Sequence, residues 1–168
     1  MQRGENLIQG ILTYARTGRE VGIKERVDVN MLIQEVFETL APKPGLLLDV
    51  PQVLPVFHTD KYPLFQVFSN LIGNAIKYHD KAEGIIRIYH KEYQGYYEFF
   101  VEDNGPGIAA HYHQKIFVIF QTLQDRDSFE STGVGLAIVK KILDARKEQI
   151  NISSEQGKGA IFSFTWSK

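Results

Sequence analysis

Apolar residues recur at helical spacing in four stretches of the chain, and each stretch is predicted to form a helix. The first is ENLIQGILTYAR, which stops naturally at Gly18. Its apolar stripe consists of Leu7, Ile8, Ile11, Leu12 and Ala15. The second, MLIQEVFETLA, follows Asn30, a residue suited to an N-cap. The third is expected to be capped by Asp60 and to run to about Tyr78, and the fourth is GVGLAIVKKILDAR.

Shorter apolar runs bounded by turn residues predict strands. These runs are RVDV, GLLLDV, VLPVFH, GIIRIYHKEY, YYEFFVED and QINISSEQGKGAIFSFTW. We expect a hairpin around Gln94 and Gly95 and a second hairpin that turns at Gly157–Gly159. Between Asn104 and Thr132 there is little periodicity, which is typical of a long binding loop or lid. Strands and helices mixed in this order favour an α+β sandwich, in which one sheet is covered on one face by helices.

Composition narrows the class of protein. The chain has 168 residues, of which 43% are hydrophobic, and this suits one compact domain. The net charge of −1 argues against a nucleic-acid surface, because phosphate binding usually needs a basic excess. The absence of cysteine excludes disulfides and thiolate metal sites and fits a reducing, cytoplasmic compartment. No apolar stretch approaches the roughly 20 residues that span a bilayer, so no membrane contact is expected, although a parent protein could be membrane-anchored.

The third predicted helix carries an unusual polar face. Asn70, Asn74 and Lys77 cluster opposite an apolar face formed by Phe65, Phe68, Ile72 and Ala75. Three polar residues on a helix are ordinarily a solvated face. However, asparagine is a poor helix former, so two of them four residues apart favour a binding role. An amide oxygen is a hard ligand that suits magnesium, and a lysine one turn later suits a phosphate.

Two glycine-containing turns are the other candidate sites. Asp103 ends a predicted strand and is followed by NGPG, where Gly105 and Gly107 would let a flat ligand approach the backbone. Its carboxylate can accept a hydrogen bond from an exocyclic amine, but an ordinary turn containing Pro106 explains the same residues. The run STGVGL opens the fourth helix, whose free amides and dipole favour an anion. A plain glycine-rich helix entry is the alternative there.

The order of these motifs resembles the ATP-binding domain of sensor histidine kinases, a branch of the GHKL superfamily. NLIGNAIKY resembles its asparagine box, DNGPGI its first glycine box, IFVIF its phenylalanine box and TGVGL its second glycine box. The resemblance implies the Bergerat fold, a mixed and mostly antiparallel sheet covered on one face by helices. Residues 1–20 resemble the end of a dimerisation helix, which leaves 21–168 as the catalytic domain.

The resemblance also implies roles for individual residues. The implied catalytic residues are Asn70, Asn74, Lys77 and Arg126, with Mg2+ held by Asn70 and Asn74. The implied ATP-binding residues are Asn74, Lys77, Tyr78, Asp103, Gly105, Gly107, Ile108, Phe120, Thr132, Gly133, Val134, Gly135 and Leu136. Asp103 would read adenine, and Lys77 would contact the phosphates. Arg126 would replace the arginine that relatives carry nearer the phenylalanine box, where this chain has Thr122.

The same resemblance favours a kinase over a hydrolase. Hydrolytic branches place a glutamate one turn before the magnesium asparagine, and this chain has Asn70 there, which cannot act as a base. A catalytically silent nucleotide-binding module and an ATP hydrolase are the alternatives. None of the five histidines lies in the family's phosphoacceptor setting, so the acceptor is expected on a dimerisation helix absent from this chain. The implied partners are that helix, a response regulator receiver domain and a second copy of the full-length protein. The chain also lacks the family's usual Gly-Gly after the last helix and has ARKEQ instead, so a different C-cap is expected.

Overall fold

The computed structural model describes residues 23–40, 42, 44–77, 83–106, 135–154 and 159–168. The elements are β1 (Lys24–Asp28), α2 (Val29–Leu40), β2 (Leu46–Asp49), β3 (Val56–Asp60), α3 (Lys61–Lys77), β4 (Gly84–Tyr93), β5 (Tyr96–Asp103), α4 (Gly135–Ala145), β6 (Ile150–Ser154) and β7 (Ala160–Ser167). The predicted helix and domain boundary near residues 1–20 lie outside the described residues. None of the helices in this described part is long and apolar enough to cross a membrane.

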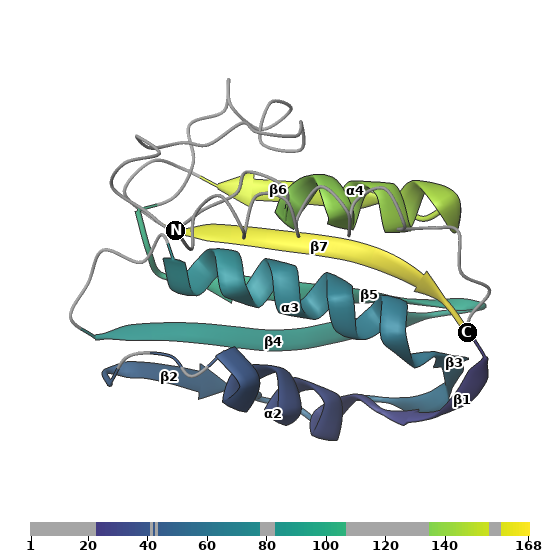
Figure 1. Cartoon of the computed structure of the whole chain (residues 1–168), viewed down its shortest axis with the longest axis horizontal. Coiled ribbons are helices and arrows are strands. Elements are labelled where there is room, and N and C mark those ends of the chain that lie inside the picture. Colours follow the sequence, from purple (N-terminus) through teal and green to yellow (C-terminus); the bar gives the residue numbers. More distant parts are fainter. Residues whose placement is uncertain (1–22, 41, 43, 78–82, 107–134, 155–158) are drawn as a thin grey trace, which may run out of the picture.

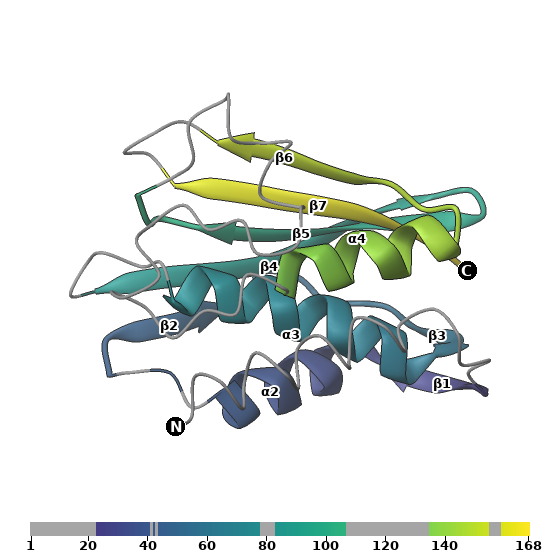
Figure 2. The same ribbon diagram turned by 45° about the horizontal axis from the view of Figure 1, so that its top comes forward.

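The described strands form a large sheet and a small one. The large sheet has five strands in the order β2-β4-β5-β7-β6, and β1 pairs with β3 in a separate ribbon. Only the β2–β4 pairing within the large sheet is parallel. Helices α2, α3 and α4 lie together on one face of the large sheet (Figures 1 and 2). The predicted α+β sandwich is therefore confirmed, as is its mixed, mostly antiparallel sheet.

Alternation along the strands builds the core. Alternate residues of β4, β5 and β7 are buried toward the helices, and the residues between them occupy the open face. The apolar face predicted for α3 is the one that packs here: Phe68, Ile72 and Ala75 are buried and Phe65 is partly buried. The Phe68 ring meets Phe99 and Phe164 edge-on, at centroid distances of 5.4 and 5.2 Å. This packing holds α3 against the middle of the sheet.

The predicted helix caps need two corrections. Helix α2 begins at Val29, and the Met31 amide donates to the Asp28 carboxylate at 3.3 Å, so Asp28 is the N-cap and not Asn30. The Asn30 side chain instead binds the backbone N–H and C=O of Leu54, at 3.2 and 3.3 Å. Asp60 does not cap α3, because its Oδ2 accepts from Arg146 at 2.8 Å and its Oδ1 has no hydrogen-bond partner within the described ranges.

The C-terminus of α4 confirms the expectation of a cap without Gly-Gly. Lys147 adopts a left-handed conformation with φ of 59°. Its amide donates to Asp144 O at 3.1 Å, and the Glu148 amide donates to Leu143 O at 2.8 Å. This pair of bonds is a Schellman motif with a lysine at the position that glycine normally takes.

The strand pairing of both predicted hairpins is confirmed. Tyr93 pairs with Tyr96 across the Gln94–Gly95 turn, where Gly95 has φ of 88°. β6 pairs with β7 from Ser154↔Ala160 to Ile150↔Phe164. Part of the second turn, residues 155–158, lies outside the described residues.

Candidate functional site

Asn70, on the polar face of α3, lies directly against the start of α4. The Asn70 Nδ2 donates to Gln66 O, one turn earlier, at 2.9 Å, and this bond fixes the orientation of the amide. The Asn70 oxygen then points toward Gly135, where an added Cβ would lie only 3.1 Å away. The side-chain-free Gly135 therefore allows the amide oxygen to approach the first turn of α4, and Figure 2 shows the two helices side by side.

The other two polar residues of this face lie in the last turn and a half of α3. Asn74 is half-buried and Lys77, the last residue of the helix, is exposed. Leu136, in contrast, packs against the hydrophobic core, so its predicted contact with a ligand would be made by backbone. The structure thus brings Asn70 together with Gly135, two motifs that are far apart in the sequence.

The end of β5 forms a turn that is closed by its own side chains. Asp103 is half-buried, and its Oδ1 accepts a hydrogen bond from the Gly105 amide at 2.9 Å. The next side chain, Asn104, accepts from the Ile85 amide at 2.9 Å and ties the turn to β4. Asp103 therefore has a fixed position at the sheet edge. The Asn104 bond was not predicted, and an asparagine directly after a strand is the only signal that pointed to it.

These two groups of residues lie toward the same end of the molecule. Helix α3 and strand β5 both run toward the side that lies on the left in Figure 1. Eight predicted site residues lie outside the described residues, so the structure does not test them: Tyr78, Gly107, Ile108, Phe120, Arg126, Thr132, Gly133 and Val134. The ligand roles of the described ones, from Asn70 to Leu136, stay predictions.

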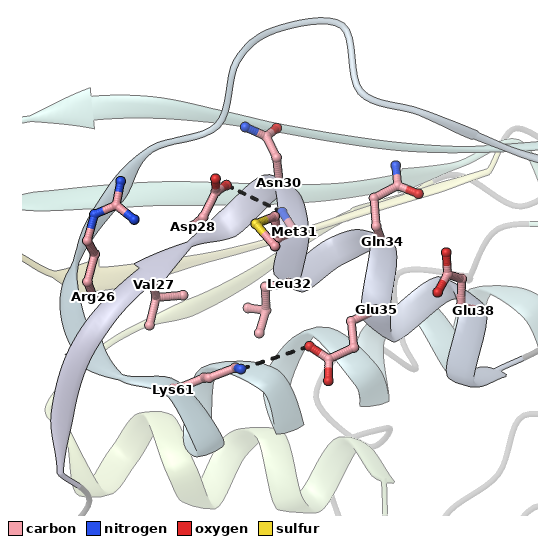
Figure 3. Close-up of a pocket in the computed structure, with 10 residues that line it drawn as sticks. All are labelled: Arg26, Val27, Asp28, Asn30, Met31, Leu32, Gln34, Glu35, Glu38 and Lys61. Atoms are coloured by element: carbon pink, nitrogen blue, oxygen red, sulfur yellow. Dashed lines mark hydrogen bonds and ion pairs between the residues drawn. The ribbon is translucent and has the colours of Figure 1, made fainter.

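A cleft of about 480 Å3 lies elsewhere, between β1, α2 and the start of α3 (Figure 3). Met31, Glu35 and Lys61 are among its lining residues, and the Lys61 Nζ is 4.0 Å from Glu35 Oε2. It contains none of the predicted site residues, and its exposed ion pair contributes little free energy. The chemistry of the polar α3 face and the β5 turn gives a stronger candidate than this cleft.

The fold defines the class of protein as a two-layer α+β domain. Residues 59–168 match the family of histidine kinase-, DNA gyrase B- and HSP90-like ATPases. Phytochrome-like protein Cph1 of Synechocystis is 35% identical over 164 residues, which are 96% of this chain and 22% of Cph1. The chain thus spans less than a quarter of the length of this relative.

Solved structures show the same similarity. Full-length ShkA, solved in complex with AMPPNP, aligns with a TM-score of 0.77 at 28% identity, over 95% of this chain and 35% of ShkA. The catalytic domain of histidine kinase ThkA aligns with a TM-score of 0.68 at 25% identity, over 87% of this chain and 96% of that domain. The chain belongs to the family of histidine kinase-, DNA gyrase B- and HSP90-like ATPases. The prediction of a catalytic domain of the sensor histidine kinase type is confirmed.

Proposed function

We propose that this domain transfers the γ-phosphate of Mg-ATP to a histidine on a dimerisation helix outside this chain. Asn70 and Asn74 would hold the magnesium ion, which would supply positive charge to neutralise the phosphates. Lys77, with Tyr78 and Arg126, would contact the phosphates, and Asp103 would accept a hydrogen bond from the adenine amine. The amides near Gly133 and Gly135, together with the helix dipole, would face the phosphates.

The observation that carries this proposal is the hydrogen bonding and orientation of the Asn70 side-chain amide. Its amide nitrogen is already used in the bond to Gln66 O at 2.9 Å, so only the oxygen faces Gly135. An amide oxygen cannot take a proton from water at neutral pH. Without a base at this position, the γ-phosphate is protected from hydrolysis, and transfer depends on positioning and charge neutralisation. This supports a kinase over a hydrolase.

The same geometry fits a magnesium ion. Amide oxygens are hard, neutral ligands, and Mg2+ is usually bound through few protein oxygens together with water and substrate phosphates. Asn74 lies one turn after Asn70 on the same face of α3, so both oxygens can face one ion. Asn70 lies close to Gly135, the first residue of α4. An ion held by Asn70 and the positive N-terminal end of the α4 dipole would therefore both favour anionic phosphates.

The placement of the two described histidines supports an external phosphoacceptor. His58 is exposed on β3, and His90 lies in the middle of β4. Burial lowers the pKa of the His90 imidazole, against a smaller opposite effect of Glu92. Neither is on a helix, and His79, His111 and His113 lie outside the described residues. We therefore infer that the phosphoacceptor histidine belongs to another segment. From the similarity to sensor histidine kinases we further propose a cytoplasmic kinase that acts as a homodimer and passes its phosphate to a response regulator receiver domain.

Binding of a fluorescent ATP analogue to this chain, with and without magnesium, tests the nucleotide site. We expect Mg2+ to strengthen binding at least tenfold in the unmodified chain and to have little effect in Asn74→Ala, because the variant lacks an ion ligand. The matched control is Asn151→Ala, which changes an exposed asparagine on β6. Equal magnesium dependence in all three proteins would contradict the proposed metal site.

Transfer of label from γ-labelled ATP separates the kinase from its alternatives. The chain is mixed with a separately produced dimerisation helix that carries the family's phosphoacceptor histidine. Label on that histidine supports the kinase, whereas tight ATP binding without transfer supports the silent regulatory module. Steady phosphate release by the chain alone, lost in Asn74→Ala, would instead support the hydrolase.

A further inference from the structure

Gly159 touches the backbone of Asp103 more closely than any side chain would permit. It directly precedes β7 and has φ of 90°, a conformation that L-residues with side chains rarely adopt. A Cβ added there would overlap the Asp103 carbonyl oxygen and would lie 3.1 Å from the Asn104 Cα. These neighbours are backbone atoms, so a side chain at 159 could be accommodated only if the end of β5 or residue 159 itself moved.

Hydrogen bonds hold both sides of this contact. Ser154 Oγ donates to Gly159 O at 2.8 Å, which fixes the glycine against the end of β6. Asn104 Oδ1 accepts from the Ile85 amide at 2.9 Å, which fixes the other side to β4. In the sheet register Asp103 faces Ala160 on β7 and Ile86 on β4. The Asp103 backbone is therefore confined between two neighbouring strands and cannot absorb a clash without displacement.

We propose that Gly159 is a positioning residue for adenine selectivity, acting through Asp103. This inference rests on the proposed function, in which the Asp103 carboxylate accepts a hydrogen bond from the adenine amine. The absence of a side chain at 159 lets the end of β5 occupy the place from which that carboxylate faces the base. Hydrogen bonds weaken steeply with distance and angle, so a displaced Asp103 would lose selectivity while the fold persists.

The chain offers a closely matched control glycine. Gly95, in the β4–β5 turn, has φ of 88°, but an added Cβ there meets nothing within 4 Å. Gly159→Ala and Gly95→Ala therefore introduce the same unfavourable backbone conformation. They differ in the contact with Asp103, so a difference in nucleotide binding between them reports on that contact.

Competition of ATP and GTP against a fluorescent nucleotide, measured on the full chain, tests the proposal. We expect Gly159→Ala to weaken ATP binding about tenfold, the loss of roughly one hydrogen bond to a charged group, with little change for GTP. Gly95→Ala should leave both affinities within about twofold, although thermal unfolding should show that both variants are destabilised. Unchanged ATP selectivity in Gly159→Ala would overturn the proposal.

A double-mutant cycle asks whether the effect passes through Asp103. In an Asp103→Ala background, the Gly159→Ala change should cost no further ATP affinity, because the carboxylate that it displaces is gone. Equal losses in both backgrounds would overturn the proposal, since they would indicate a general effect on the sheet. If the unmodified chain bound no ATP, the proposed function itself would fail; if it bound ATP selectively and Gly159→Ala did too, only this inference would fail.

A milder variant covers the case in which Gly159→Ala does not fold. Ser154→Ala removes the hydroxyl that holds Gly159 O, and Ser153→Ala is its exposed neighbour on β6. We expect Ser154→Ala to lower the ATP-to-GTP affinity ratio about threefold and Ser153→Ala to leave it unchanged. Equal ratios in the two serine variants would count against the proposal.

Discussion

At the residue scale, Asp103 has a structural role, and the proposed function gives the same carboxylate a second role in recognising adenine. Its Oδ1 closes the turn by accepting from the Gly105 amide at 2.9 Å. A carboxylate has two oxygens and can accept further hydrogen bonds, whereas it cannot donate any when ionised. This acceptor-only character is what distinguishes adenine, which offers an exocyclic amine, from guanine, which has a carbonyl at that position.

We predict that Asp103→Asn keeps the fold but loses selectivity for ATP over GTP. The amide oxygen can replace Oδ1 in the bond to Gly105, which leaves an NH2 donor where the base requires an acceptor. The unmade hydrogen bond is worth about 1–3 kcal/mol. Competition binding with ATP and GTP measures the ratio, with Asp144→Asn, an exposed change on α4, as control. Retained selectivity in Asp103→Asn would show that another group reads the base.

At the element scale, the two ends of α4 carry residues with different structural roles. Its first residue, Gly135, allows the close approach of Asn70, and its last turn is closed by the left-handed Lys147. The N-terminal glycine would serve the proposed site. The lysine at the C-terminus is unfavourable, because a left-handed conformation costs about 1–2 kcal/mol for a residue with a Cβ. The helix is therefore not optimised for stability at its C-cap.

We predict that Lys147→Gly raises the free energy of unfolding by about 1 kcal/mol, because glycine adopts the left-handed conformation without that penalty. Lys147→Ala is the matched control: it removes the same ammonium but keeps the Cβ, so its stability should be near that of the unmodified chain. Urea denaturation measures all three proteins. A gain of the same size in Lys147→Ala would mean that removal of the charge, and not the backbone conformation, is responsible.

At the scale of the whole molecule, one cluster ties the small ribbon to the large sheet. Arg146 donates to Asp60 Oδ2 at 2.8 Å and lies over the Trp166 ring at 4.0 Å from its centroid. Trp166 in turn donates to Thr59 at 2.7 Å. The Arg146 and Asp60 side chains are only 22% and 16% exposed. The cluster therefore joins β3, β7 and the residue directly after α4 in a poorly solvated place.

We predict that Arg146→Met lowers the free energy of unfolding by about 2 kcal/mol. The variant leaves the Asp60 carboxylate without its counter-charge and removes the cation–π contact, and partial exposure keeps the loss below that of a fully buried pair. The double variant Arg146→Met with Asp60→Asn should recover part of the loss, since no uncompensated charge remains. Denaturant unfolding measures each protein, and strictly additive losses would contradict the proposed coupling.

Much of the fold follows from local patterns. The helical spacing of apolar residues in α3 correctly predicts that Phe68, Ile72 and Ala75 face the core. The turn residues Gln94 and Gly95 correctly predict the hairpin between β4 and β5. The two predicted N-caps, in contrast, were wrong, because contacts with distant residues took up these side chains. Asn30 and Asp60 have the right chemistry for an N-cap, but each found a partner far along the chain, Leu54 and Arg146. A local propensity of about 1 kcal/mol is easily overridden by such contacts.

The amino-acid order alone determines the helices, the strands and the presence of the asparagine and glycine motifs, because period and turn chemistry act over a few residues. The approach of Gly135 to Asn70, and of Gly159 to Asp103, depends on how elements far apart in the chain pack together. Packing joins these residues because α3 and α4 share a core and β5 and β7 share a ladder. A sequence pattern within one segment cannot predict a contact with a distant segment, so only the tertiary structure could reveal these two contacts.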